Sequence, residues 1–284
     1  MEKEKVTTKK KRKKAQNKKK DLPFLEHLEE LRWHLIRAII SIIVFAIGAF
    51  VFKEFIFDEI IFKPRESDFI TNRLLCQLGD IIGSTVLCIN SAELTIINIK
   101  MSGQFLTHIK VSIVVGLILA FPYVFWEIWR FIKPALKNKE KNVSRGAVFW
   151  SSLLFIIGVL FGYFIVTPLS VNFFTTYFVS QDVINQINLT SYIGIITSVA
   201  LAGGAIFELP VLIYILSKAG LVGSSFLKKY RRHSIIIVLV MSAMITPPDI
   251  FSQILVAFPL FFLYEIGIII SKRIEKKRKK RFGF

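Results

Sequence analysis

The sequence has little of what a water-soluble enzyme needs. Only 20 of its 284 residues are Asp or Glu, 4 are His and 2 are Cys, whereas 53% are hydrophobic and the mean hydropathy is +0.55. The histidines are scattered without metal-ligand spacing, and the chain contains neither a phosphate-binding glycine loop nor a GxSxG motif. We therefore expect a protein that is not an enzyme, without a catalytic residue, a metal or a cofactor.

Long apolar runs take up most of the chain, which is too apolar for a soluble domain of this size. Runs near the ~20 residues that cross a hydrocarbon layer of ~30 Å predict transmembrane helices. The predicted spans lie at about 33–52, 105–126, 147–167, 191–216, 233–245 and 250–270. The last two are short and are joined by the turn Thr246-Pro247-Pro248-Asp249. The predicted fold class is an all-α integral membrane protein with six transmembrane helices.

Basic residues gather in alternate connecting segments. Lys and Arg number twelve in 1–32, six in 130–146, five in 218–232 and eight in 271–284, but there are none in 169–190. Because basic residues flank the cytoplasmic ends of membrane helices, this alternation places both termini in the cytoplasm. The expected location is the cytoplasmic (inner) membrane.

Both ends of the chain are basic tails. Residues 1–20 carry almost no apolar side chain, the predicted membrane domain runs over 21–271, and 272–284 form the second tail. A nucleic-acid ligand would suit such charge. A solvated tail that orients the first helix and touches anionic lipid also explains it, at up to roughly 1 kcal/mol per basic residue near the surface. We therefore predict contact with membrane lipid and none with nucleic acid.

The two cysteines, Cys76 and Cys88, both lie in the segment 53–103. The charge pattern places this segment outside the cytoplasm, where a disulfide is permitted. Two free thiols would look the same in the sequence, so the disulfide is one of two alternatives.

Acidic residues interrupt the basic cytoplasmic segments at two places. In LPFLEHLEELRWHLI the leucines follow helical spacing, which predicts a short amphipathic surface helix with Glu29 and Glu30 on its polar side. A local pair between either acid and Arg32 would contribute only a few tenths of a kcal/mol. Glu140 closes FWEIWRFIKPALKNKE, where a helix is expected to end. Two carboxylates on one face suit a guanidinium ligand, whose planar fork binds carboxylate through paired hydrogen bonds.

One further acid, Glu208 of GAIFELP, lies inside a predicted span. It is ten residues from Lys218, which places it about 15 Å from the cytoplasmic boundary. A carboxylate at this depth costs several kcal/mol unless it is protonated or paired, so we expect it in a groove between helices. A neutral glutamic acid that only holds helices together is the alternative.

Four motifs together resemble one family: HLEELRWHLI, FxxPALxxxE, GAIFELP and TPPDIFSQILVAFPLFFLYEIG. They are similar to the TatC family, the multi-spanning receptor subunit of the twin-arginine (Sec-independent) protein translocase, over about 22–270. The resemblance implies a receptor for signal peptides with paired arginines, carried by proteins that are exported already folded. It also implies TatA- and TatB-like single-span partners, self-association in a larger complex, and use of the protonmotive force.

The resemblance implies roles for individual residues as well. The residues expected to bind or shape the signal-peptide site are Glu29, Glu30, Arg32, Phe131, Pro134, Leu136 and Glu140. The residues expected to make polar contacts with a partner inside the membrane are Glu208, Thr246, Asp249, Gln253 and Glu265.

One position departs from the family's pattern. Where the family commonly carries Tyr-Gln before Ile-Trp, this chain has Trp126-Glu127. A local ion pair between Glu127 and Arg130 at the membrane surface is the simpler interpretation. A third carboxylate near the receptor face is the alternative.

A proton-coupled secondary solute transporter is the competing function, because several helices, a buried Glu and no enzyme motif describe it equally well. Such transporters are commonly built from internal repeats with matching broken helices. We find no such repeat, and the two cytoplasmic acid sites would have no role in it.

Overall fold

The computed structural model describes residues 24–66, 68–83, 95–132, 144–180, 182, 185–246 and 250–282. Its longer helices are α2 (Phe24–Val51), α4 (Gly103–Ile132), α5 (Ser144–Phe161), α7 (Leu189–Phe207), α8 (Leu209–Ala219), α10 (Arg231–Ile245) and α11 (Ile250–Phe282). Its shorter elements are η1 (Phe55–Ile61), η2 (Lys63–Arg65), α3 (Ile70–Ile82), β1 (Ile96–Ile97), η6 (Gly162–Val166), α6 (Thr167–Thr176), β2 (Ile187–Asn188) and α9 (Ser224–Lys229).

Within the described residues, five helical stretches are long and apolar enough to cross a membrane: Glu29–Val51, Gly103–Ile132, Gly146–Thr176, Leu189–Ala219 and Gln253–Arg278. They correspond to five of the six predicted spans. The helix at the other predicted span, 233–245, is α10. It has 15 residues and is only about 22 Å long, less than a bilayer core of about 30 Å. The sixth span and the cytoplasmic termini stay predictions, and 247–249 of the predicted turn lie outside the described residues.

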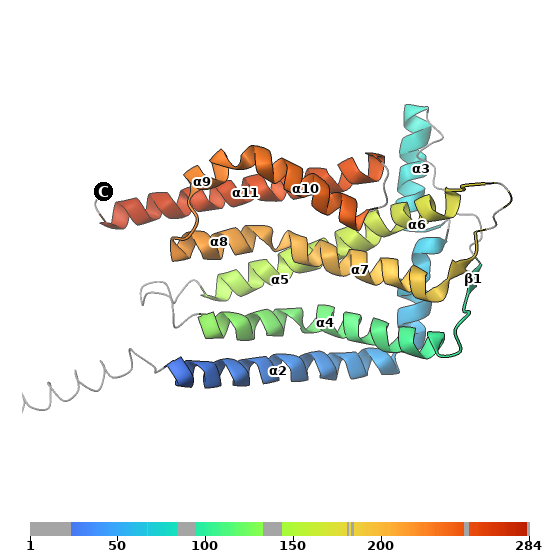
Figure 1. The fold of residues 1–284 in the computed structure, drawn as a ribbon, viewed down its shortest axis with the longest axis horizontal. Helices are drawn as coiled ribbons and strands as arrows, with labels where there is room; N and C mark the ends of the chain where they lie inside the picture. The colour runs from blue at the N-terminus through green and yellow to red at the C-terminus, as the bar shows by residue number, and fades with distance from the viewer. Residues whose placement is uncertain are drawn as a thin grey trace, which may run out of the picture.

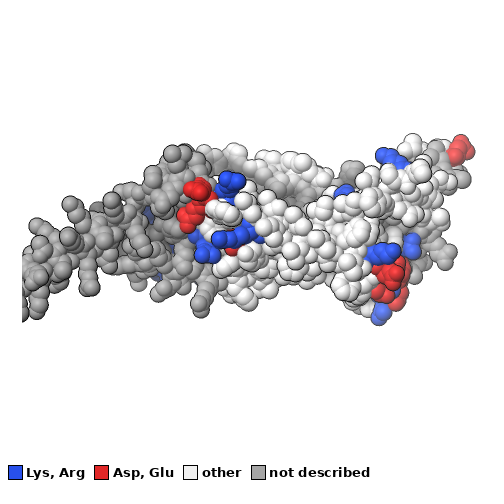
Figure 2. Space-filling view, turned by 90° about the horizontal axis from the view of Figure 1, so that it is seen from below, with Lys and Arg blue, Asp and Glu red and all other residues white. Residues whose placement is uncertain are grey.

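The surface of the bundle is apolar between its two ends. Figure 1 shows the long helices lying roughly side by side, with α3 across one end. Large apolar side chains on several helices point outward, among them Val44, Trp150 and Ile236 with exposed fractions of 60%, 60% and 62%. Figure 2 shows charged side chains near both ends of the visible face and an uncharged band between them. So large an apolar surface requires a partner, and the chain is therefore a membrane protein.

The first two long helices, α2 and α4, lie against each other at a glycine. A Cβ atom on Gly116 of α4 would lie 2.6 Å from the backbone nitrogen of Ala46 on α2. Small residues at such positions let membrane helices approach closely, and the resulting packing stabilises the pair. Gly116 therefore sets the distance between the two helices.

We predict that Gly116→Ala destabilises the protein by about 1–3 kcal/mol, because the added methyl group forces α2 away from α4. Gly48 of α2 is the matched control, since a Cβ atom there meets nothing within 4 Å. Gly48→Ala should be neutral or stabilising by up to about 1 kcal/mol through helix propensity. Unfolding midpoints of both variants in the same detergent test this, and equal midpoints would refute the packing role of Gly116.

The end of the bundle that bears α3 is fixed by side-chain hydroxyl groups. Pro168 in α6 has no N–H and so cannot donate the α-helical hydrogen bond to the carbonyl of Phe164, and Thr71 of α3 donates a hydrogen bond to that carbonyl. The hydroxyl of Tyr192 donates to the carbonyl of Ile61 at 3.0 Å. The strands β1 and β2 pair in parallel at the same end. The segment between α2 and α4 is thus attached to the long helices.

The last helices form a hairpin. The Oγ of Ser242 on α10 donates to the carbonyl of Gln253 on α11 at 3.1 Å, and the Nε2 of Gln253 donates to the carbonyl of Leu239 at 3.3 Å. At its far end, α11 holds α9, because Glu275 accepts from the backbone N–H of Ser224 at 2.8 Å. An acidic group at a helix N-terminus stabilises that helix.

Candidate functional site

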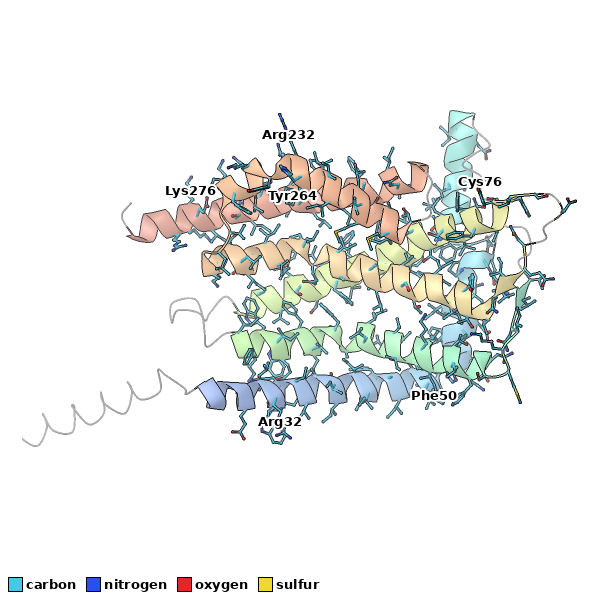
Figure 3. All side chains as sticks on the ribbon, viewed as in Figure 1. Arg32, Phe50, Cys76, Arg232, Tyr264 and Lys276 are labelled. Atoms are coloured by element: carbon cyan, nitrogen blue, oxygen red, sulfur yellow. The ribbon has the colours of Figure 1, made fainter. Side chains whose placement is uncertain are left out.

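The predicted surface helix and the first span are one helix. We expected a short amphipathic helix that leads into the span, but α2 runs without interruption from Phe24 to Val51. No proline or glycine lies between Phe24 and Gly48, so nothing in the sequence breaks the helix. Near the start of α2, Glu29 is exposed and Glu30 is half-buried. Figure 3 shows Arg32 on the side of α2 that faces away from α4.

One turn after Glu30, α2 contacts α4 through buried polar groups. The Nδ1 atom of His34 forms a hydrogen bond with Oε2 of Glu127, and the hydroxyl of Tyr123 donates to Oε1 of the same carboxylate at 3.1 Å. His34 is 7% exposed and Glu127 is 1% exposed. Phe131 packs edge-on against the His34 ring, with ring centroids 6.3 Å apart. We call these four residues the His34–Glu127 cluster.

The expected ion pair between Glu127 and Arg130 is wrong. Both carboxylate oxygens of Glu127 are used by His34 and Tyr123, and the guanidinium of Arg130 lies over the Trp126 ring, 5.7 Å from its centroid. The reason is the depth of Glu127, because a carboxylate that is nearly excluded from solvent requires hydrogen-bond partners that reach it, and His34, itself buried, supplies one of them.

The remaining residues of the expected signal-peptide site follow α4 in the sequence. α4 ends at Ile132, one residue after Phe131. Pro134, Leu136 and Glu140 lie outside the described residues. Phe131 is thus the one expected residue of this loop motif that the structure describes, and it lies beside His34, one turn from Glu30.

Glu208 lies at a helix junction between α7 and α8, as expected for a groove between helices. Pro210 follows it and begins α8. The Oγ of Ser151 on α5 donates to Oε2 of Glu208 at 2.8 Å. Its Oε1 atom is buried and has no hydrogen-bond partner among the described residues. The carboxyl group therefore has one contact that holds helices together and one oxygen that is available to a further donor.

The other residues expected to meet a partner already have contacts inside the chain. Thr246 donates to the carbonyl of Ser242 at 2.8 Å, and Gln253 makes the hairpin contact described above. Both oxygens of Glu265 accept from the guanidinium of Arg231, which ties α11 to the start of α10. Asp249 lies outside the described residues.

No group of three or more His, Cys, Asp or Glu residues that could hold a metal ion occurs in the described segments. Cys76 lies on α3, as Figure 3 shows. Cys88 lies outside the described residues, so the disulfide between the two stays a prediction.

The sequence analysis did not predict that His34 and Tyr123 both contact Glu127. Tyr123 and Glu127 are four residues apart on α4 and so share a helix face, which was a usable signal. The signal that was absent is the partner, because His34 is 93 residues away in the chain. Only the packing of α2 on α4 brings it near.

The long apolar helices and the buried polar contacts between them define a multi-spanning helical membrane protein. Within this class the chain belongs to the TatC family, because the family model described as Sec-independent protein translocase protein (TatC) matches residues 26–259. It is therefore a component of the Sec-independent protein translocase and not an enzyme. This membership decides against the solute transporter that the sequence left open.

Relatives and solved structures agree over nearly the whole chain. The TatC protein of Blattabacterium sp. subsp. Periplaneta americana is 43% identical over 92% of this chain and 99% of its own length. The TatC protein of Aquifex aeolicus is 35% identical over 91% of this chain and 98% of its own length. A crystal structure of the twin-arginine translocase receptor TatC in DDM has a TM-score of 0.67 and 33% identity, over 87% of this chain and 100% of that chain.

Proposed function

We propose that this protein is the component of the translocase that binds twin-arginine signal peptides at the cytoplasmic face. In this proposal Glu30 and Glu140 receive the arginine pair, and Phe131, Pro134 and Leu136 shape the same surface. Export of the folded cargo then proceeds across the cytoplasmic membrane with TatA- and TatB-like single-span partners and the protonmotive force. The six-span topology, with both termini in the cytoplasm, is part of the proposal.

One observation carries the proposal. The His34–Glu127 cluster holds the first turns of α2, with Glu30, against the last turns of α4, with Phe131. Two motifs separated by about a hundred residues in the sequence therefore meet at one end of the bundle. The 26–259 match to the TatC family supports the same assignment, since related solved structures are described as twin-arginine translocase receptors.

The arginine pair can supply only part of the binding free energy of the signal peptide. A charge-assisted contact is worth roughly 1.5–3 kcal/mol, so two arginines, each counted as one such contact, contribute about 3–6 kcal/mol. Micromolar affinity corresponds to about 8 kcal/mol. We infer that the apolar part of the signal peptide contributes the remainder against the exposed apolar sides of the bundle, where Leu35, Ile39 and Trp126 are among the exposed side chains.

Breaking the His34–Glu127 contact should destabilise the protein. We predict a loss of about 3–5 kcal/mol for Glu127→Ala, because His34 and Tyr123 then lose a buried partner, and a smaller loss for Glu127→Gln, which still forms hydrogen bonds. A double-mutant cycle of His34→Ala with Glu127→Ala should give a coupling energy of about 0.5–3 kcal/mol. The cycle of Arg130→Ala with Glu127→Ala is the control and should be additive. Coupling to Arg130 in place of His34 would contradict the structure.

The proposed function itself is tested by crosslinking of a twin-arginine precursor to the protein in native membranes. We expect a precursor with an Arg-Arg pair to crosslink to residues near Glu30, and the same precursor with Lys-Lys to do so much less. Equal crosslinking of both precursors would rule out recognition of the pair. Transport of a small solute by the purified chain alone would contradict the proposal altogether.

A further inference from the structure

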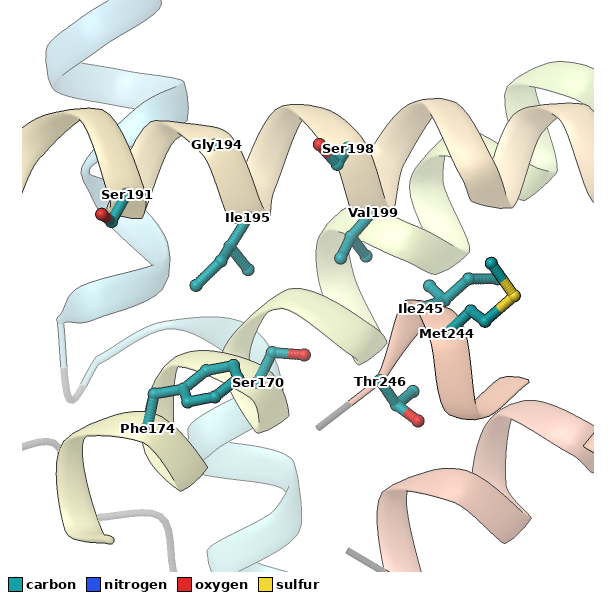
Figure 4. A pocket seen from close by; sticks show the side chains of 10 residues that line it. All are labelled: Ser170, Phe174, Ser191, Gly194, Ile195, Ser198, Val199, Met244, Ile245 and Thr246. Atoms are coloured by element: carbon teal, nitrogen blue, oxygen red, sulfur yellow. The ribbon is translucent and has the colours of Figure 1, made fainter. Parts of the chain in front are cut away.

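A cavity of about 390 Å³ lies between α6, α7 and the end of α10, at the end of the bundle that bears α3. Figure 4 shows that both polar and apolar side chains line it. The hydroxyl groups of Ser170, Ser191, Ser198 and Thr246 lie among its lining residues, together with apolar side chains such as that of Phe174. The cavity is therefore suited to a molecule that is polar in one part and apolar in another.

Ser170 provides a hydrogen-bond donor that is not used within the described chain. Its side chain is 1% exposed, and its Oγ atom has no hydrogen-bond partner among the described residues. In Figure 4 this hydroxyl points into the space lined by α7 and the end of α10. Because buried polar groups in proteins are nearly always hydrogen-bonded, the position favours a ligand that accepts a hydrogen bond.

A positive charge lies beside Gly194, one of the residues that line the cavity. A Cβ atom built on Gly194, which lines the cavity, would be 3.8 Å from the Nζ atom of Lys110 on α4. Lys110 is seven residues into α4, so it lies about 10 Å along the helix from Gly103. The ion pairs formed within the described residues do not include it. A lysine inside a membrane span is unfavourable without an anion, and such residues commonly mark binding sites.

We propose that this cavity binds the phosphate of an anionic phospholipid headgroup, with Lys110 as the cation and Ser170 as a hydrogen-bond donor. Lysine acts on phosphate as a point charge, and the hydroxyls of Ser191 and Ser198 can donate to the remaining oxygens. The exposed side chains of Phe174 and Met244 provide the apolar surface along which an acyl chain lies. The proposal concerns a different part of the molecule from the signal-peptide site and does not depend on it.

The size and depth of the cavity suit a lipid headgroup. A cavity of 390 Å³ falls within the range of about 300–1,000 Å³ that is usual for small ligands. Depth agrees with this choice, because α7 begins at Leu189, only two residues before Ser191, so the hydroxyl of Ser191 lies near the bundle end where headgroups are found.

Native mass spectrometry of the delipidated full-length protein in detergent tests the proposal. The protein is titrated with dioctanoyl phosphatidylglycerol, and we expect saturable binding that is weakened about tenfold or more by Lys110→Gln, the effect of losing one charged hydrogen bond. Lys110→Arg should bind nearly as the wild type does, and Ser170→Ala should weaken binding severalfold. Lys100→Gln is the matched control, since Lys100 is exposed, lies ten residues earlier and carries the same charge.

Three results would overturn the proposal. The first is equal affinity of Lys110→Gln and Lys100→Gln for phosphatidylglycerol. The second is displacement of the bound lipid by inorganic phosphate, which would identify a site for the free anion. The third is a crosslink from Ser198 to a single-span partner protein with none to lipid. If Lys110→Gln does not fold, unchanged binding by Ser170→Ala together with lost binding by Lys110→Arg overturns the proposal as well.

Discussion

Replacing both Glu30 and Glu140 by lysine is expected to abolish the preference for Arg-Arg over Lys-Lys signal peptides while the protein still inserts into the membrane. The reversal removes two hydrogen-bonded ion pairs and adds repulsion, so we expect a loss of at least about 3–6 kcal/mol of binding free energy, or more than a hundredfold in affinity. Crosslinking of an Arg-Arg precursor to membrane vesicles that contain the variant measures the effect.

The control for this double variant is Glu54→Lys, because Glu54 is exposed and follows α2 at its opposite end. It reverses one acid, half of the change of charge in the double variant, far from the proposed site and should leave crosslinking unchanged. Unchanged crosslinking to the Glu30 and Glu140 double variant would remove the central element of the proposed function. Loss of crosslinking in the Glu54→Lys control would show that the effect is one of total charge.

Replacing Glu208 by alanine is expected to separate signal-peptide binding from export. The carboxyl group lies at the junction of α7 and α8, away from the His34–Glu127 cluster, and one of its oxygens has no partner in the described chain. We therefore expect binding at the cytoplasmic surface within about twofold of the wild type and export reduced about tenfold, as for the loss of one charged hydrogen bond to a partner. Parallel assays of crosslinking and export in the same vesicles measure both.

Ser151→Ala distinguishes a packing role of Glu208 from a role in assembly. Ser151 donates to Glu208 at 2.8 Å and is fully buried. Its removal leaves the carboxyl group in place but deletes the contact between α5 and the α7–α8 junction. If Ser151→Ala lowers export as much as Glu208→Ala does, packing explains the result. Full export by Glu208→Ala would make its role purely structural.

The long helices could be predicted from the sequence, but the residues at which they end could not. Apolar runs locate the spans because the hydrocarbon core selects for them, but α4 continues to Ile132 and α11 to Phe282, beyond the predicted ends at about 126 and 270. The continuation lies in charged and aromatic sequence, where hydropathy no longer reports on helix formation. Pro122 and Pro259 both lie inside helices, so proline did not mark the ends either.

Prediction of the candidate site depended on whether a residue's partner was local. The expectation that Glu208 lies between helices needed only the cost of exposing a carboxylate to lipid. The partner of Glu127 could not be predicted in this way, since His34 belongs to another helix and the nearest opposite charge in the sequence, that of Arg130, faces Trp126. A buried acid takes the partner that shares its environment, and that environment is a property of the packed helices.

The most direct test of the receptor function is the affinity of the purified protein in nanodiscs for a signal peptide that carries Arg-Arg and for the same peptide with Lys-Lys. Because the arginine fork binds carboxylate through paired hydrogen bonds that lysine cannot form, we predict that Arg-Arg binds at least about tenfold more tightly, and that the ratio falls to about one in the Glu30→Lys, Glu140→Lys variant. Equal affinities of the wild-type protein for the two peptides would contradict the proposed function.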